Sequence, residues 1–270
     1  MIVDAHGHVH DPVTRHIELL DEAGVDRAVL FASRPHPERA TDLASFRREM
    51  AVLDTAIAGG QPDGASFRAA SEDLDAALAR YPDRFIGFGP LDLHRPAEDV
   101  AAAIQDDIVG RGRAGIGELS PPPGRFELLE PVLRAATDHA GLPVVVHGFA
   151  PTTDGDLRTL AALSSRYRSV PVVVSQLGGL NWLTAIDLVR EHPSMYLDLS
   201  TACVVFALRL AVREVPERTM FGSDAPYGDP VLSRAAVERV TGPGELRDRV
   251  LGGTVSALLA GGPAARRGRH

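Results

Sequence analysis

The sequence predicts one closed barrel of eight β–α units, a (β/α)8 fold. Eight short apolar runs alternate along the chain with amphipathic stretches, as in proteins with parallel sheets. The runs are rich in Val and Ile and are apolar throughout rather than at every second residue, which indicates a sheet buried on both faces. The length of 270 residues also suits one barrel, because such barrels use about 250 residues. An open doubly wound sheet is the alternative, but it normally has about five or six strands.

The apolar runs are short and bounded by polar, Gly or Pro residues, as strands are. The predicted strands are Ile2–Val9, Arg27–Ala32, Phe85–Leu91, Ala114–Leu119, Pro143–His147, Val170–Ser175, Met195–Leu199 and Thr219–Ser223. The helix-type stretches between and after them are Ile17–Ala23, Leu43–Ala58, Leu74–Ala79, Ala97–Val109, Leu128–His139, Leu157–Tyr167, Asn181–His192, Val204–Val215, Leu232–Val240 and Glu245–Leu259. The Gly- and Pro-containing segment Gly59–Ala65 predicts a loop that forms part of a lid over the barrel mouth.

The composition favours a protein that acts on a small molecule. The net charge of -8 and the isoelectric point of about 5.7 argue against a general binder of nucleic acids or anionic membranes, because both need a basic surface. No stretch of about 18 residues is apolar enough to span a bilayer, and the start of the chain is not typical of a secretion signal. The single cysteine, Cys203, excludes an internal disulfide and fits a cytoplasmic protein. We expect one barrel domain over residues 1–262 and a disordered basic tail over 263–270.

Two histidines close the first predicted strand. His6 and His8 lie two residues apart, so in a strand both side chains point to the same face, about 7 Å apart along the backbone. His147 and Asp224 each end a later apolar run. The active site of a (β/α)8 barrel lies at the C-terminal ends of its strands, so we expect these four side chains to meet there. Three nitrogens and one carboxylate oxygen suit one divalent ion, with zinc expected and manganese or iron compatible with the same ligands.

The motifs around these residues resemble the amidohydrolase superfamily, in particular its second large branch, which includes small-molecule hydrolases, lactonases, hydratases and non-oxidative decarboxylases. The resemblance extends from Ile2 to about Leu259. The matching pieces are Asp4–His8, Gly115–Glu118, Val146–His147 and Gly222–Pro226. Each piece is weak alone, but their order and spacing together are specific.

Glu118 has two interpretations. In two-metal relatives of the superfamily, a carboxylate or carboxylated lysine at this strand-four position bridges the ions. A carboxylate pointing into the barrel is costly to bury without a partner, so we expect Glu118 to meet a metal, a metal-bound water or a cation. The other interpretation is a structural salt bridge with Arg113 or Arg125.

Gln176 is the main departure from the family pattern. The resemblance implies a histidine before the Gly-Gly pair at strand six, where the chain has Gln176 followed by Leu177, Gly178 and Gly179. An amide cannot take up and release a proton near neutral pH, although its carbonyl can weakly ligate a metal and its NH2 group can hold a substrate oxygen. The catalytic proton transfer is therefore assigned to Asp224 or to Glu118.

The expected activity is metal-assisted hydrolysis of a carbon–nitrogen or carbon–oxygen bond at a carbonyl carbon, with Asp224 as the base and acid. The first alternative is a lyase, either a non-oxidative decarboxylase or a hydratase of a small carboxylated compound. In that case Arg34 and Gln176 would orient the substrate, since a guanidinium can hold a carboxylate through two hydrogen bonds. An alternative of another class is a non-catalytic descendant that only binds a ligand. A second copy of the chain is left open as a partner.

Overall fold

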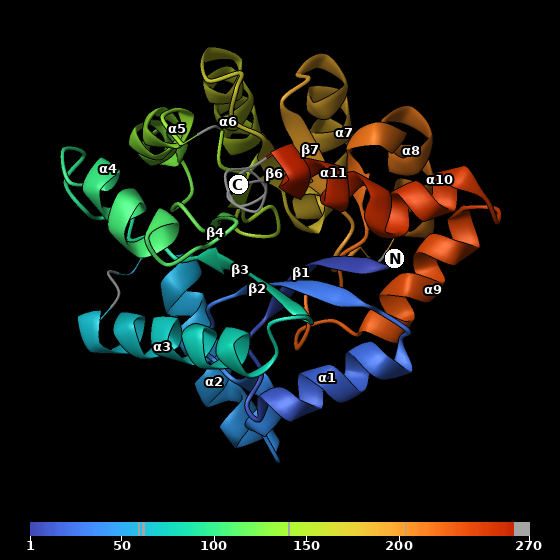
Figure 1. Ribbon diagram of the computed structural model, residues 1–270. Helices are drawn as coiled ribbons and strands as arrows, with labels where there is room; N and C mark the ends of the chain where they lie inside the picture. Colours follow the sequence, from blue (N-terminus) through green and yellow to red (C-terminus); the bar gives the residue numbers. More distant parts are fainter. Residues whose placement is uncertain (59, 61–62, 140, 203, 262–270) are drawn as a thin grey trace, which may run out of the picture.

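The structure is a computed structural model that describes residues 1–58, 60, 63–139, 141–202 and 204–261. Eight parallel strands follow one another in chain order around a barrel, and helices surround them (Figure 1). The predicted (β/α)8 fold is therefore confirmed. The strands are β1 (Val3–His8), β2 (Arg27–Phe31), β3 (Phe85–Gly89), β4 (Gly115–Leu119), β5 (Val144–Val146), β6 (Val172–Val174), β7 (Met195–Asp198) and β8 (Thr219–Met220).

The barrel closes through the segment that follows β8. Residues 219–223 are predicted as one strand, but β8 ends at Met220. Beyond it, the amide of Ala5 donates to the carbonyl of Phe221 at 2.9 Å, and the amide of Asp224 donates to the carbonyl of His6 at 2.8 Å. The amide of His8 donates to the carbonyl of Ala225 at 2.7 Å. The last segment of the barrel is thus held against β1 by irregular hydrogen bonds rather than by a regular ladder.

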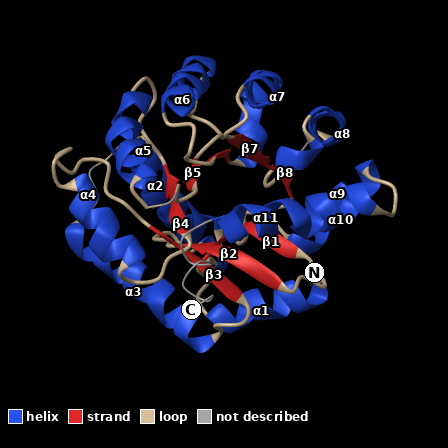
Figure 2. Ribbon diagram, turned by 45° about the horizontal axis from the view of Figure 1, so that its top comes forward, coloured by secondary structure: helices blue, strands red, loops and turns tan. Residues whose placement is uncertain are grey.

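The helices form an outer ring around the strands (Figure 2). They are α1 (Val13–Glu22), α2 (Leu43–Ile57), α3 (Gly64–Arg80), α4 (Val100–Ala103), α5 (Glu130–Thr137), α6 (Asp154–Arg166), α7 (Trp182–Glu191), α8 (Val205–Glu214), α9 (Pro230–Val240), α10 (Glu245–Asp248) and α11 (Thr254–Gly261). Short turns of other helix types are η1 (Pro37–Arg39), η2 (Ile104–Val109), η3 (Phe126–Leu129), η4 (Gln176–Asn181), η5 (Pro216–Arg218) and η6 (Arg249–Gly253). Helices α2 and α3 are both inserted between β2 and β3.

The strands are buried on both faces, as their continuous apolar sequences predict. Side chains between the sheet and the helices form one large core cluster. A second cluster fills the barrel interior and includes Val3, Val29, Phe88 and Val173. Val255 of α11 joins this second cluster, so α11 covers the end of the barrel opposite the C-terminal ends of the strands.

Helix α3 is longer than the sequence predicts. The predicted helical stretch begins at Leu74, whereas α3 begins at Gly64, because the side chain of Asp63 accepts hydrogen bonds from the amides of Ala65 and Ser66 and caps the helix. The loop and lid predicted over residues 59–65 therefore overlap a helix start, and residues 59, 61 and 62 lie outside the described residues. Cys203 and the predicted tail 263–270 lie outside them too. Among the described residues, no helix is long and apolar enough to cross a membrane.

Candidate metal centre

Three predicted ligands meet at the C-terminal ends of β1 and β8. The period of two in β1 places His6 and His8 on one face, and their Nε2 atoms lie 3.3 Å apart. Oδ1 of Asp224 lies 3.4 Å from Nε2 of His6 and 3.3 Å from Nε2 of His8. Among the described residues, these three form the group of His, Cys, Asp or Glu side chains whose arrangement could hold a metal ion.

The arrangement fits a divalent cation. Oδ1 of Asp224 is buried and has no hydrogen-bond partner within the described part of the chain, which is costly unless a cation or water satisfies it. Separations of 3.3 to 3.4 Å are also those expected between ligands held about 2.0–2.1 Å from one tetrahedral ion. Burial lowers the pKa of His6, but the carboxylates of Asp198, Glu118 and Asp224 outweigh it and raise that pKa to about 10. The surroundings of His6 therefore favour positive charge.

Glu118 and His147 pair beside this group. Oε2 of Glu118 lies 3.8 Å from Nε2 of both His6 and His8. Its Oε1 accepts a hydrogen bond from the hydroxyl of Ser175 and lies 3.2 Å from Nδ1 of His147. Nε2 of His147 lies 3.3 Å from the carbonyl oxygen of Ala150. His147 is therefore a neighbour of the group formed by His6, His8 and Asp224 but not a member of it.

The structural salt bridge considered for Glu118 does not form. Arg113 is paired with Asp75, and Arg125 is paired with Glu127 at 2.6 Å. Glu118 faces His6 and His8 instead, and its contact with a metal or a metal-bound water stays a prediction.

Gln176 holds Asp224 in place. Its backbone adopts a left-handed conformation with φ of 55°, and its Nε2 donates to Oδ2 of Asp224 at 3.1 Å. Its carbonyl oxygen accepts from the amides of Gly148 and Phe149 at 3.3 and 3.0 Å. The hydroxyl of Thr201 also donates to Oδ2 of Asp224, at 2.6 Å. Two donors thus occupy Oδ2, and Oδ1 is left for a cation.

Asp198 is a site residue that the sequence analysis missed. It ends β7, and its Oδ2 lies 3.0 Å from Nδ1 of His6. A carboxylate there accepts the Nδ1 hydrogen, so Nε2 of His6 keeps the lone pair that a metal needs. The other oxygen of Asp198 accepts from the amides of Gln176 and Ser200 at 3.2 and 2.9 Å. The sequence signal is a ligand-type residue near the end of an apolar run, but Asp198 lies one residue before the end of the predicted strand 195–199 and so does not meet the rule that found His147 and Asp224.

A cavity of about 500 Å³ opens over the centre. Its lining includes His8, Glu118, His147, Gln176 and Asp224, and Arg34 and Tyr227 are among its other polar side chains. The guanidinium carbon of Arg34 lies 5.6 Å from the centre of the Phe67 ring. Tyr227 stands edge-on to His8 at 5.6 Å, and its pKa is raised by burial and by the charge of Asp224, so its hydroxyl keeps its proton.

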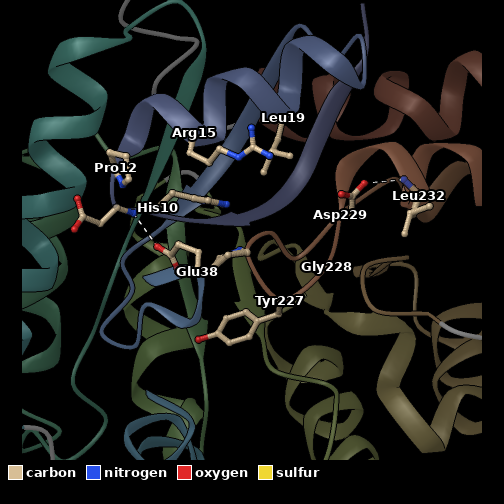
Figure 3. A pocket seen from close by; sticks show the side chains of 11 residues that line it. His10, Pro12, Arg15, Leu19, Glu38, Tyr227, Gly228, Asp229 and Leu232 are labelled. Carbon is tan, nitrogen blue, oxygen red and sulfur yellow. Dashed lines mark hydrogen bonds between the residues drawn. The ribbon is translucent and has the colours of Figure 1, made fainter. Parts of the chain in front are cut away.

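A second cavity, of about 470 Å³, lies beside the first, and Tyr227 lines both. Figure 3 shows Arg15 and Leu19 of α1 on one side of it and Asp229 and Leu232 on the other. None of the three clustered ligand-type residues lines this second cavity. It therefore lies outside the candidate metal centre.

A (β/α)8 barrel with histidine and carboxylate ligands at the C-terminal ends of its strands is an architecture used by metal-dependent enzymes. The chain belongs to the amidohydrolase family (Amidohydro_2), whose pattern matches residues 3–259. The resemblance inferred from the motifs is thereby confirmed. A search of curated proteins found no match.

Solved structures with the same fold include several decarboxylases. An uncharacterised TIM-barrel protein from Bordetella bronchiseptica has a TM-score of 0.69 and 16% identity, covering 98% of this chain and 99% of that chain. The 5-carboxyvanillate decarboxylase LigW from Sphingomonas paucimobilis has a TM-score of 0.65 and 16% identity, covering 96% and 98%. A dihydroxybenzoic acid decarboxylase from Polaromonas, with bound manganese and the inhibitor 2-nitroresorcinol, has a TM-score of 0.63 and 16% identity, covering 96% of each chain.

Proposed function

We propose that the protein is a metal-dependent lyase that removes the carboxylate of a small ring compound as CO2. The observation that carries this proposal is how the two oxygens of Asp224 are placed. Oδ2 accepts hydrogen bonds from Gln176 and Thr201, and Oδ1 faces the histidine nitrogens. Hydrolysis needs a base that takes a proton from water, and neither Asp224 in this state nor the amide of Gln176 serves well, which leaves only Glu118 of the predicted catalytic residues. Decarboxylation needs no such base. The decarboxylases among the similar folds support this choice.

The ligand set that we propose for the ion is His6, His8 and Asp224, with His147 as the fourth ligand predicted from the sequence. If Nδ1 of His147 donates to Glu118, its Nε2 carries the lone pair that a metal requires. When bound, the ion would act as a Lewis acid that holds the carboxylate and an adjacent oxygen of the substrate. Zinc remains the expected ion from the ligand types, and the manganese of the Polaromonas decarboxylase makes manganese the first alternative.

The side chains around the centre divide the remaining work. Arg34 orients the substrate carboxylate, because no ion pair of Arg34 is found among the described residues and it lines the cavity. One amide hydrogen of Gln176 binds Asp224, and the other is available for a substrate oxygen. As the bond between the ring carbon and the carboxyl carbon breaks, its electron pair stays on the ring carbon and CO2 leaves. Glu118 relays a proton from solvent to that carbon.

The test compares two classes of substrate on the same metal-reconstituted protein. One class contains 5-carboxyvanillate and dihydroxybenzoates, and the other contains simple esters, lactones and amides. We expect CO2 release from the first class in heavy water, with one deuterium at the carbon that carried the carboxylate, and no hydrolysis of the second. Hydrolysis without CO2 release would instead support the hypothesis of metal-assisted hydrolysis by an activated water. Glu118→Gln should retain the metal and lower turnover by about 10²-fold or more.

If the wild type holds the metal but converts neither class of substrate, the result would instead favour a protein that only binds a ligand. This outcome is separable from a missing cofactor, because metal content is measured on the same sample. The matched control is Glu127→Gln, which removes an exposed carboxylate that pairs with Arg125 away from the cavity.

A further inference from the structure

The cavity over the metal centre is chemically divided. The side chains of the metal end come from the C-terminal ends of β1, β4, β5 and β6 and from the segment after β8. Its other side lies against the insertion formed by α2 and α3, where the lining is apolar except for Asp54 of α2. The larger apolar side chains from these two helices are Met50, Leu53, Ile57 and Phe67, and Leu93 and Phe149 line the cavity from the segments after β3 and β5.

Helix α2 presents an apolar stripe to this cavity. Met50, Leu53 and Ile57 are spaced by three and four residues, so they lie on one face of the helix. No residue of α2 is fully buried, and these three are half-buried. Their apolar face therefore has no protein core beneath it and lies against the cavity. Leaving such a face in contact with water is unfavourable, and an apolar group placed in the cavity would cover it.

The cavity volume also exceeds the need of the metal end alone. At about 500 Å³ it falls within the range of pockets that hold drug-sized ligands. The Arg34 guanidinium stacks over Phe67 and marks the border between the polar end and the apolar end. A ligand whose carboxylate reaches Arg34 and the metal centre would leave the space along α2 empty unless it carries a further group.

We propose that the substrate is a ring carboxylate with an extended apolar substituent remote from the carboxylate, and that this substituent lies along Met50, Leu53 and Ile57. The proposal rests on the proposed function, because that function places the carboxylate at the metal end. Helix α2 is then the element that determines specificity. It contacts the part of the substrate that does not react.

The test is a binding series on the full chain with manganese bound. Salicylate, 4-propylsalicylate and 4-pentylsalicylate are titrated by calorimetry, with and without the metal. Each buried methylene should strengthen binding by about fourfold at most, so five would give at most about 10³-fold. The expected gain is set well below that limit: the pentyl compound should bind at least about 30-fold more tightly than salicylate. Leu53→Gln should reduce the affinity for the pentyl compound by about tenfold and leave salicylate unchanged.

Leu43→Gln is the matched control, because Leu43 is an exposed residue of the same helix and does not line the cavity. It should alter neither affinity. Unchanged salicylate binding also shows that Leu53→Gln is folded, and Ile57→Gln provides a second variant. Metal-dependent salicylate binding without any gain from the alkyl chain, or a gain that survives both α2 variants, would overturn the proposal and leave the proposed function standing. Failure of all three compounds to bind in a metal-dependent way would overturn both.

Discussion

At the residue scale, the candidate centre depends on side chains that orient other side chains. Asp198 fixes which nitrogen of His6 carries the hydrogen, and Gln176 and Thr201 fix which oxygen of Asp224 is free. The consequence is that Nε2 of His6 and Oδ1 of Asp224 face each other at 3.4 Å. Such preorganisation lowers the cost of binding and is expected to govern affinity.

Asp198→Asn should reverse the tautomer of His6. The asparagine oxygen should continue to accept from the amides of Gln176 and Ser200, which turns its NH2 group toward Nδ1 of His6. His6 would then carry its hydrogen on Nε2 and lose its ligand lone pair. We expect metal affinity to fall by about 10–100-fold in calorimetric titration, and ¹⁵N NMR should report the tautomer. Unchanged affinity and tautomer would contradict this role of Asp198.

His147→Ala tests the ligand that the structure leaves outside the group. If His147 completes the ligand set, the variant should bind the ion about tenfold or more weakly, as loss of a supporting group at a metal site does. The measurement is metal content after dialysis against a graded series of chelator concentrations. His139→Ala is the control, since His139 follows the C-terminal end of α5 and does not line the cavity. Full metal retention by His147→Ala would refute the ligand role.

His16 should make the fold sensitive to acid. It is fully buried between His10 and Phe85, and neither ring nitrogen has a hydrogen-bond partner within the described residues. Burial, with the nearby charges of His10, His8 and Arg84, holds the pKa of His16 well below its usual value. The unfolded chain therefore binds this proton more readily than the folded protein does.

The free energy of unfolding should consequently decrease as the pH falls below about 6.5, by up to about 1 kcal/mol per pH unit from this group. His16→Leu should remove that contribution, as measured by urea unfolding between pH 7 and pH 5 in the presence of chelator. The exposed His94 gives the control variant His94→Gln. Equal pH dependence in wild type and His16→Leu would show that another group is responsible.

Much of the candidate centre could be predicted from the sequence. The remainder depends on contacts between segments that are distant in the chain. His6 and His8 follow from the period of two at the end of an apolar run, and Asp224 follows from its place after the last run. The direction of the Gln176 side chain could not be predicted, because it depends on a left-handed backbone that turns the amide toward Asp224. The partner of Asp198 lies 192 positions away in the chain.

At the element scale, strands are more predictable than helix ends. The Val-only strands β5 and β6 lie within their predicted ranges, because such runs suit only a sheet covered on both faces. Helix starts depend on single capping side chains, and the start of α3 at Gly64 follows from Asp63. Helix α2 depends on its cap in the same way, since no residue of α2 is fully buried.

Asp42→Ala should loosen α2 without unfolding the barrel. Asp42 accepts a hydrogen bond from the amide of Ser45 at 2.7 Å, and the hydroxyl of Ser45 accepts from the amide of Asp42 in return. Loss of such a cap costs about 1 kcal/mol. We expect faster amide hydrogen exchange over residues 43–57 and a thermal unfolding midpoint within about 2 °C of wild type, because a locally open helix leaves the core intact. Unchanged exchange in α2 would contradict this view.

At the scale of the whole molecule, the ion should connect the first strand to the last segment of the barrel. Its proposed ligands come from β1, from His147 after β5 and from Asp224 after β8, so binding should stabilise the folded state only. At a free ion concentration of about 100 times the dissociation constant, the gain is about 3 kcal/mol. Differential scanning calorimetry should show a higher midpoint with manganese or zinc, and the increase should be absent in His6→Ala. A similar increase in that variant would place the ion elsewhere.

The backbone bonds that close the barrel also set when the centre can exist during synthesis. A ribosome releases His6 and His8 early, but the amide of Asp224, which bonds to the carbonyl of His6, emerges some 200 residues later. Until then the group of three ligand-type residues lacks its carboxylate. If the protein binds the proposed ion, it can therefore do so only late in synthesis, because a nascent chain interrupted before its final sixth lacks Asp224.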